Sequence, residues 1–128
     1  MTDYEMRIRL AEAMGWTDLD WQSRPGWIIG QNPGSGMRDH VPDPLVYDTD
    51  AAALEVWCVT TRPWCAGLTI VVDARSVEVC VDTYEGDPDI EPVVVHNDTE
   101  PDPRRRRRLA LCRAICHALD DPDAGGEA

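Results

Sequence analysis

Three short apolar runs in the second half of the chain limit its fold more than any other feature. They are residues 68–72, 77–82 and 93–95, and in the second run valines alternate with polar or small side chains. Alternation with a period of two predicts a half-buried strand. Pro92 stands at the start of the third run, where a sheet tolerates proline. Because the connections, such as residues 74–76, are short, the runs predict an antiparallel meander.

Three helices are expected around this meander. Each begins after a residue suited to the N-cap, namely Thr2, Asp48 or Thr49, and Asp102. Such side chains accept hydrogen bonds from the first free amides of a helix. Apolar spacing and bounding residues then place the helices at residues 3–14, 51–58 and 103–119.

Residues 16–47 show no sustained periodicity, apart from a possible short strand at 27–29. A connection of this length is unusual inside a compact domain and is often functional. The chain is therefore predicted to be an α/β (α+β) sandwich with the order helix, loop, helix, three strands, helix. We expect one domain over residues 1–119 and an acidic flexible tail over 120–128.

The charge balance excludes several classes of function. The 128 residues contain 12 arginines, no lysine and 24 acidic residues, which gives a formal charge of −12. Binding to DNA, RNA or anionic membranes needs a basic surface, so none is expected here. No apolar run approaches the ~20 residues of a membrane span. The N-terminus also has no apolar signal core. We expect a soluble protein of the cytoplasm.

The five cysteines are expected to be reduced thiols of the core; they are Cys58, Cys65, Cys80, Cys112 and Cys116. Without a signal sequence, an odd number of cysteines does not indicate a disulfide framework. Cys112 and Cys116 are four residues apart on a predicted helix, but His117 points elsewhere. A zinc site needs three or four converging ligands, so no metal or cofactor is expected.

The run of arginines at residues 104–108 is the strongest functional signal. On a helical wheel Arg105 and Arg108 extend the apolar face, whereas Arg106 and Arg107 point to solvent. Cations at a helix start oppose the macrodipole and need an anionic partner. That partner is either internal, since eight acidic residues lie in residues 82–102, or a bound phosphate. In the second case Arg105 and Arg108 are the expected ligands.

Further candidate ligand-binding residues lie outside the arginine run. Trp21 and Trp27 either stack on a base or pin the long loop to the core. Gly34 lies in a glycine-rich segment that allows close approach of a ligand, or that simply forms a turn. His96 follows the third strand, but the sequence places no nucleophile beside it. No catalytic residue is therefore assigned.

Four segments together resemble the phage ABA sandwich domain, a family of small bacteriophage proteins. The segments are LAEAMGW at residues 10–16, HVPDP at 40–44, YDTDAAA at 47–53 and LCRA at 111–114. The resemblance covers roughly residues 3–119. It implies helices covering a small antiparallel sheet, and a phage or prophage origin. Small phage proteins of similar size and fold class include "sponges", which sequester nucleotide immune signals of the host.

Two functional hypotheses follow. The first is a homo-oligomeric counter-defence protein that sequesters a cyclic oligonucleotide or ADP-ribose-type signal in the host cytoplasm without cleaving it. The second is an acidic interaction protein that binds and inhibits a host protein by mimicking nucleic acid, since a charge of −12 attracts basic partners. An enzyme acting on a nucleotide is a third and weaker hypothesis.

Overall fold

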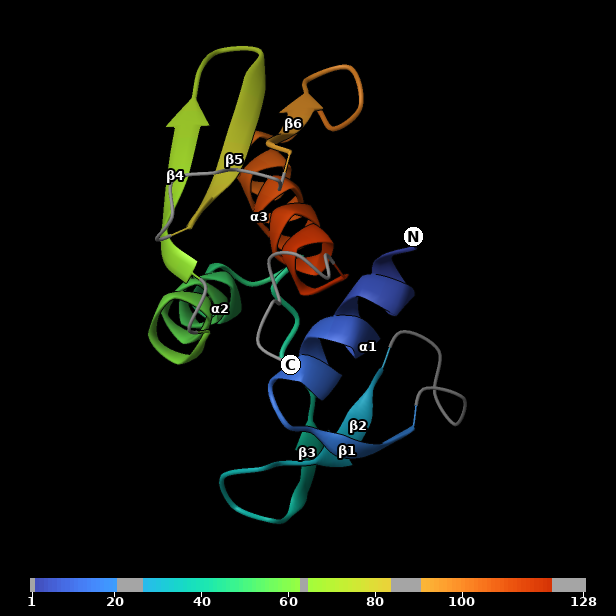
Figure 1. Cartoon of the computed structure of the whole chain (residues 1–128). Helices are drawn as coiled ribbons and strands as arrows, with labels where there is room; N and C mark the ends of the chain where they lie inside the picture. The colour runs from blue at the N-terminus through green and yellow to red at the C-terminus, as the bar shows by residue number, and fades with distance from the viewer. Residues whose placement is uncertain (1, 21–26, 63–64, 84–90, 121–128) are drawn as a thin grey trace. The chain divides into compact units, whose positions relative to one another are not determined.

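The chain is an α+β protein with the element order α-βββ-α-βββ-α (Figure 1). The computed structural model describes residues 2–20, 27–62, 65–83 and 91–120. The chain divides into a first unit, Met1–Asp43, and a second unit, Pro44–Ala128. The expected single domain over residues 1–119 stays a prediction. Asp120 is the last residue of a helix, and the rest of the expected tail lies outside the described residues.

The first unit opens with helix α1 (Asp3–Ala13), close to the predicted 3–14. The amide of Glu5 donates a hydrogen bond of 3.1 Å to Thr2 Oγ1, which confirms the predicted N-cap. Gly15 follows the helix with a φ of 97°. This left-handed conformation is common just after a helix and favours glycine.

The long loop predicted over residues 16–47 is wrong, because a second small sheet lies within it. Strands β1 (Thr17–Asp20), β2 (Ile29–Gln31) and β3 (Arg38–His40) pair antiparallel in that order. The strand expected at 27–29 begins only at Ile29. Strands of three or four residues are too short to show an alternating pattern, so the sequence gives no periodic signal for them.

The core of the first unit is small. The buried residues Ala11, Trp16, Ile28 and Val41 form one cluster. Trp16, directly after Gly15, is 7% exposed. At Gly30 a Cβ atom would lie 2.6 Å from Leu19 Cδ2. The same Cβ would lie 3.0 Å from the carbonyl oxygen of Thr17, so a larger residue here would crowd β1.

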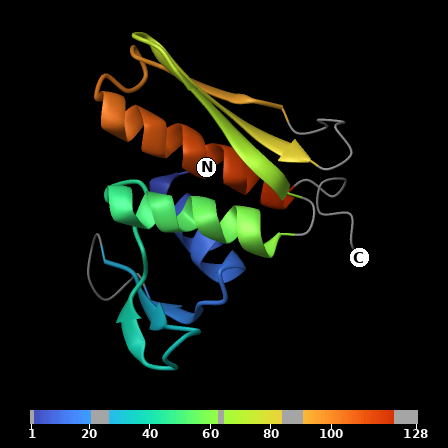
Figure 2. The same ribbon diagram turned by 90° about the vertical axis from the view of Figure 1, so that its left-hand side faces the viewer.

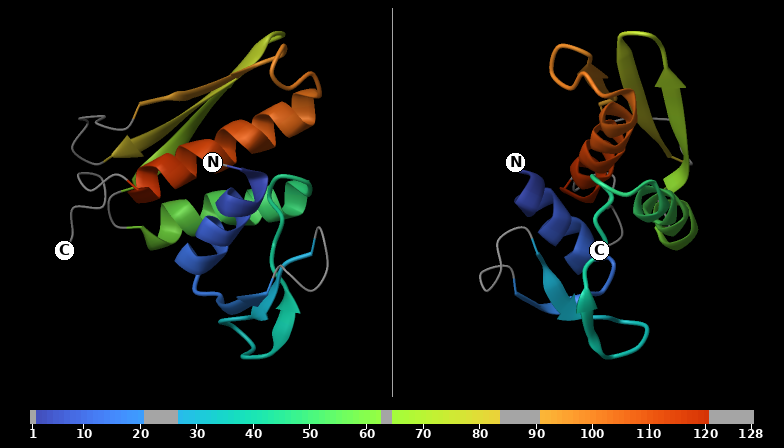
Figure 3. Two further views of the ribbon diagram at one scale, coloured as in Figure 1. Left: turned by 90° about the vertical axis from the view of Figure 1, so that its right-hand side faces the viewer. Right: turned by 180° about the vertical axis from the view of Figure 1, so that it is seen from behind.

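The second unit contains the predicted three-stranded meander and two helices. Its elements are α2 (Asp48–Thr61), β4 (Cys65–Val72), β5 (Ser76–Thr83), β6 (Val93–His96) and α3 (Pro103–Asp120). The strand order is β4-β5-β6, with both pairs antiparallel. Helix α3 lies along one face of this sheet and α2 lies beside α3 (Figures 2 and 3).

The two faces of this second sheet differ as the valine alternation predicted. Val77, Val79 and Val95 are at most 1% exposed and belong to the face that α3 covers. Val71 and Val94 lie on the opposite face and are 52% and 40% exposed. The register places Val71 and Val94 on either side of Glu78. One face of the sheet is therefore core, and the other is left exposed.

The tight connection between β4 and β5 is held by Asp73. Its Oδ1 atom accepts hydrogen bonds from the amides of Arg75 (2.7 Å) and Ser76 (2.8 Å). These two bonds stabilise the carboxylate and hold the pKa of Asp73 below its usual value.

Of the two N-caps predicted for the helices of this unit, the structure confirms one and contradicts the other. Asp102 Oδ1 accepts a hydrogen bond of 3.0 Å from the amide of Arg104, so the cap of α3 is confirmed. The cap predicted for α2 at Asp48 or Thr49 is wrong, because α2 begins at Asp48 and follows Tyr47, which makes no side-chain capping bond. The Asp48 carboxylate instead contacts an arginine of α3.

Candidate functional site

Arg105 lies in the first turn of α3 and pairs with a carboxylate. Its Nε atom lies 2.7 Å from Glu100 Oε1, and the two side chains are 33% and 16% exposed. Glu100 is one of the eight acidic residues that the sequence offered as internal partners. The pair accounts for a cation at a helix start, because the carboxylate offsets the unfavourable interaction with the macrodipole.

Arg106 is buried, which contradicts the solvent-facing position that the helical wheel gave it. It is 4% exposed, and its guanidinium donates to two backbone carbonyls. Nε lies 2.9 Å from Glu100 O, and Nη2 lies 3.1 Å from Pro101 O. The wheel failed because it omits the chain that precedes the helix, and that chain folds back over the side chain. Arg107 is exposed, as predicted.

Arg108 joins α3 to the start of α2. Its Nε atom donates to Leu45 O at 2.9 Å, and Nη1 lies 2.6 Å from Asp48 Oδ1. The side chain is 12% exposed. Asp48 is 60 residues away in sequence, so no local pattern could reveal this partner.

These contacts favour the internal explanation of the arginine run. Arg105 and Arg108 each lie against a carboxylate, and Arg106 is held by carbonyl groups. A phosphate at Arg105 or Arg108 would compete with the Glu100 or Asp48 carboxylate for the guanidinium. That competition is costly at Arg105, because Glu100 is only 16% exposed, and weaker at Arg108, because Asp48 is 64% exposed and screened by solvent. Phosphate binding by these two arginines stays a prediction.

Trp27 is 46% exposed and lies two residues before β2. Its ring contacts the imidazole of His40 edge-on, with centroids 4.7 Å apart and planes at 65°. Arg38 is two residues from His40 on β3 and so shares its face of the sheet. Arg38 Nη1 donates to Asp18 O at 3.3 Å. This face therefore carries the Trp27–His40 ring pair and, two residues away on β3, an arginine that contacts β1. Trp21 lies outside the described residues.

The two remaining candidates lie in exposed turns. Gly34 is in the β2–β3 connection, where its amide donates to Asn32 Oδ1 at 2.8 Å. His96 ends β6, and its carbonyl accepts from the amides of Thr99 and Glu100. Glu100 therefore contacts both His96 and Arg105. Trp27 and Gly34 belong to the first unit, whereas His96, Arg105 and Arg108 belong to the second.

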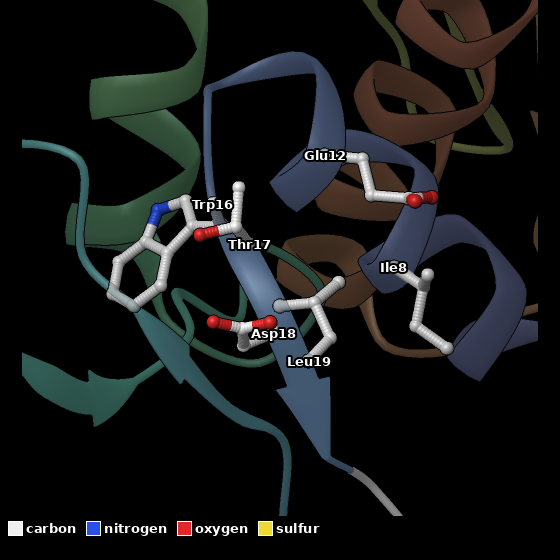
Figure 4. Close-up of a pocket in the computed structure, with 6 residues that line it drawn as sticks. All are labelled: Ile8, Glu12, Trp16, Thr17, Asp18 and Leu19. Carbon is white, nitrogen blue, oxygen red and sulfur yellow. The ribbon is translucent and has the colours of Figure 1, made fainter.

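A cavity of about 460 Å³ in the first unit was not predicted (Figure 4). Its lining residues are Ile8, Glu12, Trp16, Thr17, Asp18 and Leu19. Asp18 has a φ of 52° and lies where the β1–β2 register is irregular. Such a bulge re-aims side chains, but sequence alone does not reveal it. The two carboxylates, Glu12 on α1 and Asp18 on β1, make the lining unsuited to a phosphate.

The exposed face of the second sheet is acidic and partly apolar. Besides Val71 and Val94, it carries Glu78, Cys80 and Asp82. Strands β4, β5 and β6 contain no arginine. Partial burial and the neighbouring Glu78 carboxylate raise the pKa of the Cys80 thiol. This face is therefore a region of negative charge bordered by exposed valines, and it was not predicted from the sequence.

Two features are absent from the described residues, 2–20, 27–62, 65–83 and 91–120. Within these ranges no group of three or more His, Cys, Asp or Glu side chains is arranged to hold a metal ion. In the same ranges no helix has the length and apolar character needed to cross a bilayer.

Comparison with known proteins adds no relative to these observations. No protein-family model matches the chain, and no curated protein or solved structure does. The resemblance to the phage ABA sandwich domain therefore rests on the four sequence segments alone.

Proposed function

We propose that this chain is a non-catalytic binding protein that engages a basic protein of the host through the exposed face of its second sheet. The observation that carries the proposal is the pair Glu78 and Asp82, which stands on a face without arginine and beside exposed valines. Carboxylates attract a basic partner, and apolar side chains add contact area once the partner is docked.

The charge of the whole chain supports this proposal. A formal charge of −12 attracts basic surfaces over a distance of about a Debye length, roughly 8 Å at physiological salt. Arg105, Arg106 and Arg108 are engaged in internal contacts and so contribute little to a cationic pocket. Nucleic acid presents the same combination of dense negative charge and apolar surface to its protein partners.

Neutralising the acidic face tests this function. We expect the Glu78→Gln/Asp82→Asn double variant to bind its partner about tenfold more weakly than the wild type at low salt. The measurement is quantitative capture of host-extract proteins on the immobilised variants, at low and at high ionic strength. The control, Asp39→Asn/Asp98→Asn, removes the same charge from two exposed residues outside the face.

Two results would count against the proposal. One is equal loss of captured proteins from the control and from the double variant, which would show that net charge alone matters. The other is capture that does not weaken with salt, because an electrostatic complex must be screened.

A second candidate is sequestration of a nucleotide-derived host signal, as in the phage proteins called sponges. The observation that favours it is the exposed Trp27 ring against His40, with Arg38 on the same face. A base can stack on an indole while a guanidinium contacts phosphate. The ligand would then bind at the face of the first sheet that carries Trp27 and His40, and not at Arg105 and Arg108.

The Trp27 site is tested with cyclic dinucleotides, cyclic trinucleotides and ADP-ribose as probes. Because loss of base stacking costs about 1–3 kcal/mol, we expect Trp27→Leu to weaken binding at least fivefold. The readouts are the ligand-induced shift of Tm and recovery of intact ligand after denaturation. Met37→Ala, which alters a 70% exposed side chain at the turn end of the β2–β3 hairpin, away from the Trp27–His40 pair, is the control. No shift of the wild-type Tm with any probe would exclude this candidate.

We also propose a phage origin, a location in the host cytoplasm and self-association. Each follows from the resemblance or from the size of the chain, and light scattering of the purified protein measures the oligomeric state directly.

A further inference from the structure

Two buried thiols of the second unit lie in direct contact. Cys58 is in the last turns of α2, and Cys65 is the first residue of β4. Their sulfur atoms are 3.8 Å apart, and both residues are 0% exposed. Seven positions separate the two residues in sequence, so the fold brings them together across a helix–strand connection. Neither hydrophobic patterning nor spacing predicted this contact.

The backbone beside Cys65 departs from the regular strand ladder. Cys65 pairs with Thr83 while Gly67 pairs with Asp82, so Ala66 is an extra residue in β4. A bulge of this kind leaves one residue outside the regular ladder. A disulfide requires the sulfur atoms to approach to about 2.05 Å, a movement of roughly 1.8 Å from their present separation. Formation of the bond therefore requires rotation of the two side chains and a small shift of the backbone at the bulge.

We propose that Cys58 and Cys65 are a redox-active pair. They form an intramolecular disulfide by exchange with a low-molecular-weight disulfide such as oxidised glutathione. The other three cysteines are placed differently. Cys80 lies on the exposed sheet face beside Glu78, and Cys112 and Cys116 are buried along a single helix. The proposal is independent of the function proposed above.

The chemistry balances as a two-step thiol–disulfide exchange. Cys58 donates its S–H hydrogen bond to Cys65, which lowers the pKa of Cys65 and raises that of Cys58. The Cys65 thiolate therefore attacks one sulfur of oxidised glutathione and releases the first glutathione thiolate. Cys58 then loses its proton and attacks Cys65 sulfur in the mixed disulfide, which releases the second glutathione. Two protein thiols are oxidised and one glutathione disulfide is reduced to two thiols.

Burial of the two thiols slows the first step of this exchange. Both sulfur atoms are covered, so the first attack requires a local opening at the end of α2. Once the mixed disulfide forms, the second sulfur is already adjacent, and ring closure competes well with reversal. The Cys58–Cys65 disulfide links α2 to β4 and reduces the conformational entropy of the unfolded chain.

The positions of the arginines allow a direct test by trypsin and mass spectrometry. Arg62 precedes Pro63, a bond that trypsin leaves intact, so Cys58 and Cys65 fall in one peptide covering residues 39–75. No other cysteine lies in that peptide. The wild-type protein is equilibrated with oxidised glutathione, quenched by alkylation and digested. We expect this peptide to be lighter by two hydrogens and to carry no alkyl group.

The melting temperature and the alkylation state at equilibrium provide two further tests. The oxidised wild type should melt about 5–10 °C above the reduced form, since an eight-residue loop is closed. Cys58→Ala and Cys65→Ala should abolish this difference, and Cys80→Ser should retain it. Alkylation of both thiols in residues 39–75 at equilibrium would overturn the proposal. A stable glutathione adduct on Cys65 would do so as well, and both outcomes are read in the wild type without any variant.

Discussion

Arg106→Ala is expected to lower the free energy of unfolding by about 2–4 kcal/mol. The wild-type guanidinium is buried at 4% exposure and donates to Glu100 O and Pro101 O. Truncation removes these two charge-assisted bonds and leaves space where the arginine stem packed. The first turn of α3 and the turn that precedes it should both loosen.

Arg107→Ala is the matched control for this loss. Arg107 is the next residue of the same helix and is exposed. The two variants remove the same charge from the same turn, so their effects on the macrodipole are similar. We expect Arg107→Ala to change stability by no more than about 0.5 kcal/mol. Urea unfolding followed by circular dichroism measures both, and equal stability of the two variants would contradict the buried position of Arg106.

Only part of the environment of the arginine run was predictable from the sequence. From the sequence, cations at the start of α3 were expected to need anionic neighbours, and Glu100 was among the acidic residues available. The Arg105–Glu100 pair agrees with this expectation. The sequence could not identify Asp48, because that contact depends on how α2 packs beside α3. It placed Arg106 in solvent because a helical wheel treats a helix as isolated.

The fold divides in the same way. The meander at β4–β6 was predictable because valines alternate over a strand of eight residues. The sheet at β1–β3 was missed because its strands have only three or four residues and depend on close packing at Gly30. Contacts across the fold, such as that between Cys58 and Cys65, have no signal in a single sequence. Regular patterns and the caps of α1 and α3 were therefore predicted from the sequence, whereas side-chain contacts between distant residues were not.

Arg108→Ala distinguishes a structural arginine from a ligand-binding one. Its Nε atom donates to Leu45 O, and Leu45 is 1% exposed, so truncation withdraws a donor from a buried residue. We expect a loss of about 1.5–3 kcal/mol in the free energy of unfolding. A ligand-binding arginine would behave in the opposite way, because its removal would abolish nucleotide binding and leave stability nearly unchanged.

Asp48→Asn separates the two bonds that Arg108 makes. The Asp48 side chain is 64% exposed, so solvent and salt screen its attraction to the guanidinium. We expect this variant to lose no more than about 1 kcal/mol, and less at high salt. If Asp48→Asn were as damaging as Arg108→Ala, the ion pair rather than the bond to Leu45 O would hold α3 against the start of α2. Chemical denaturation of both variants at two ionic strengths decides between these accounts. The larger and salt-independent loss for Arg108→Ala would establish that this arginine is a structural link within the second unit.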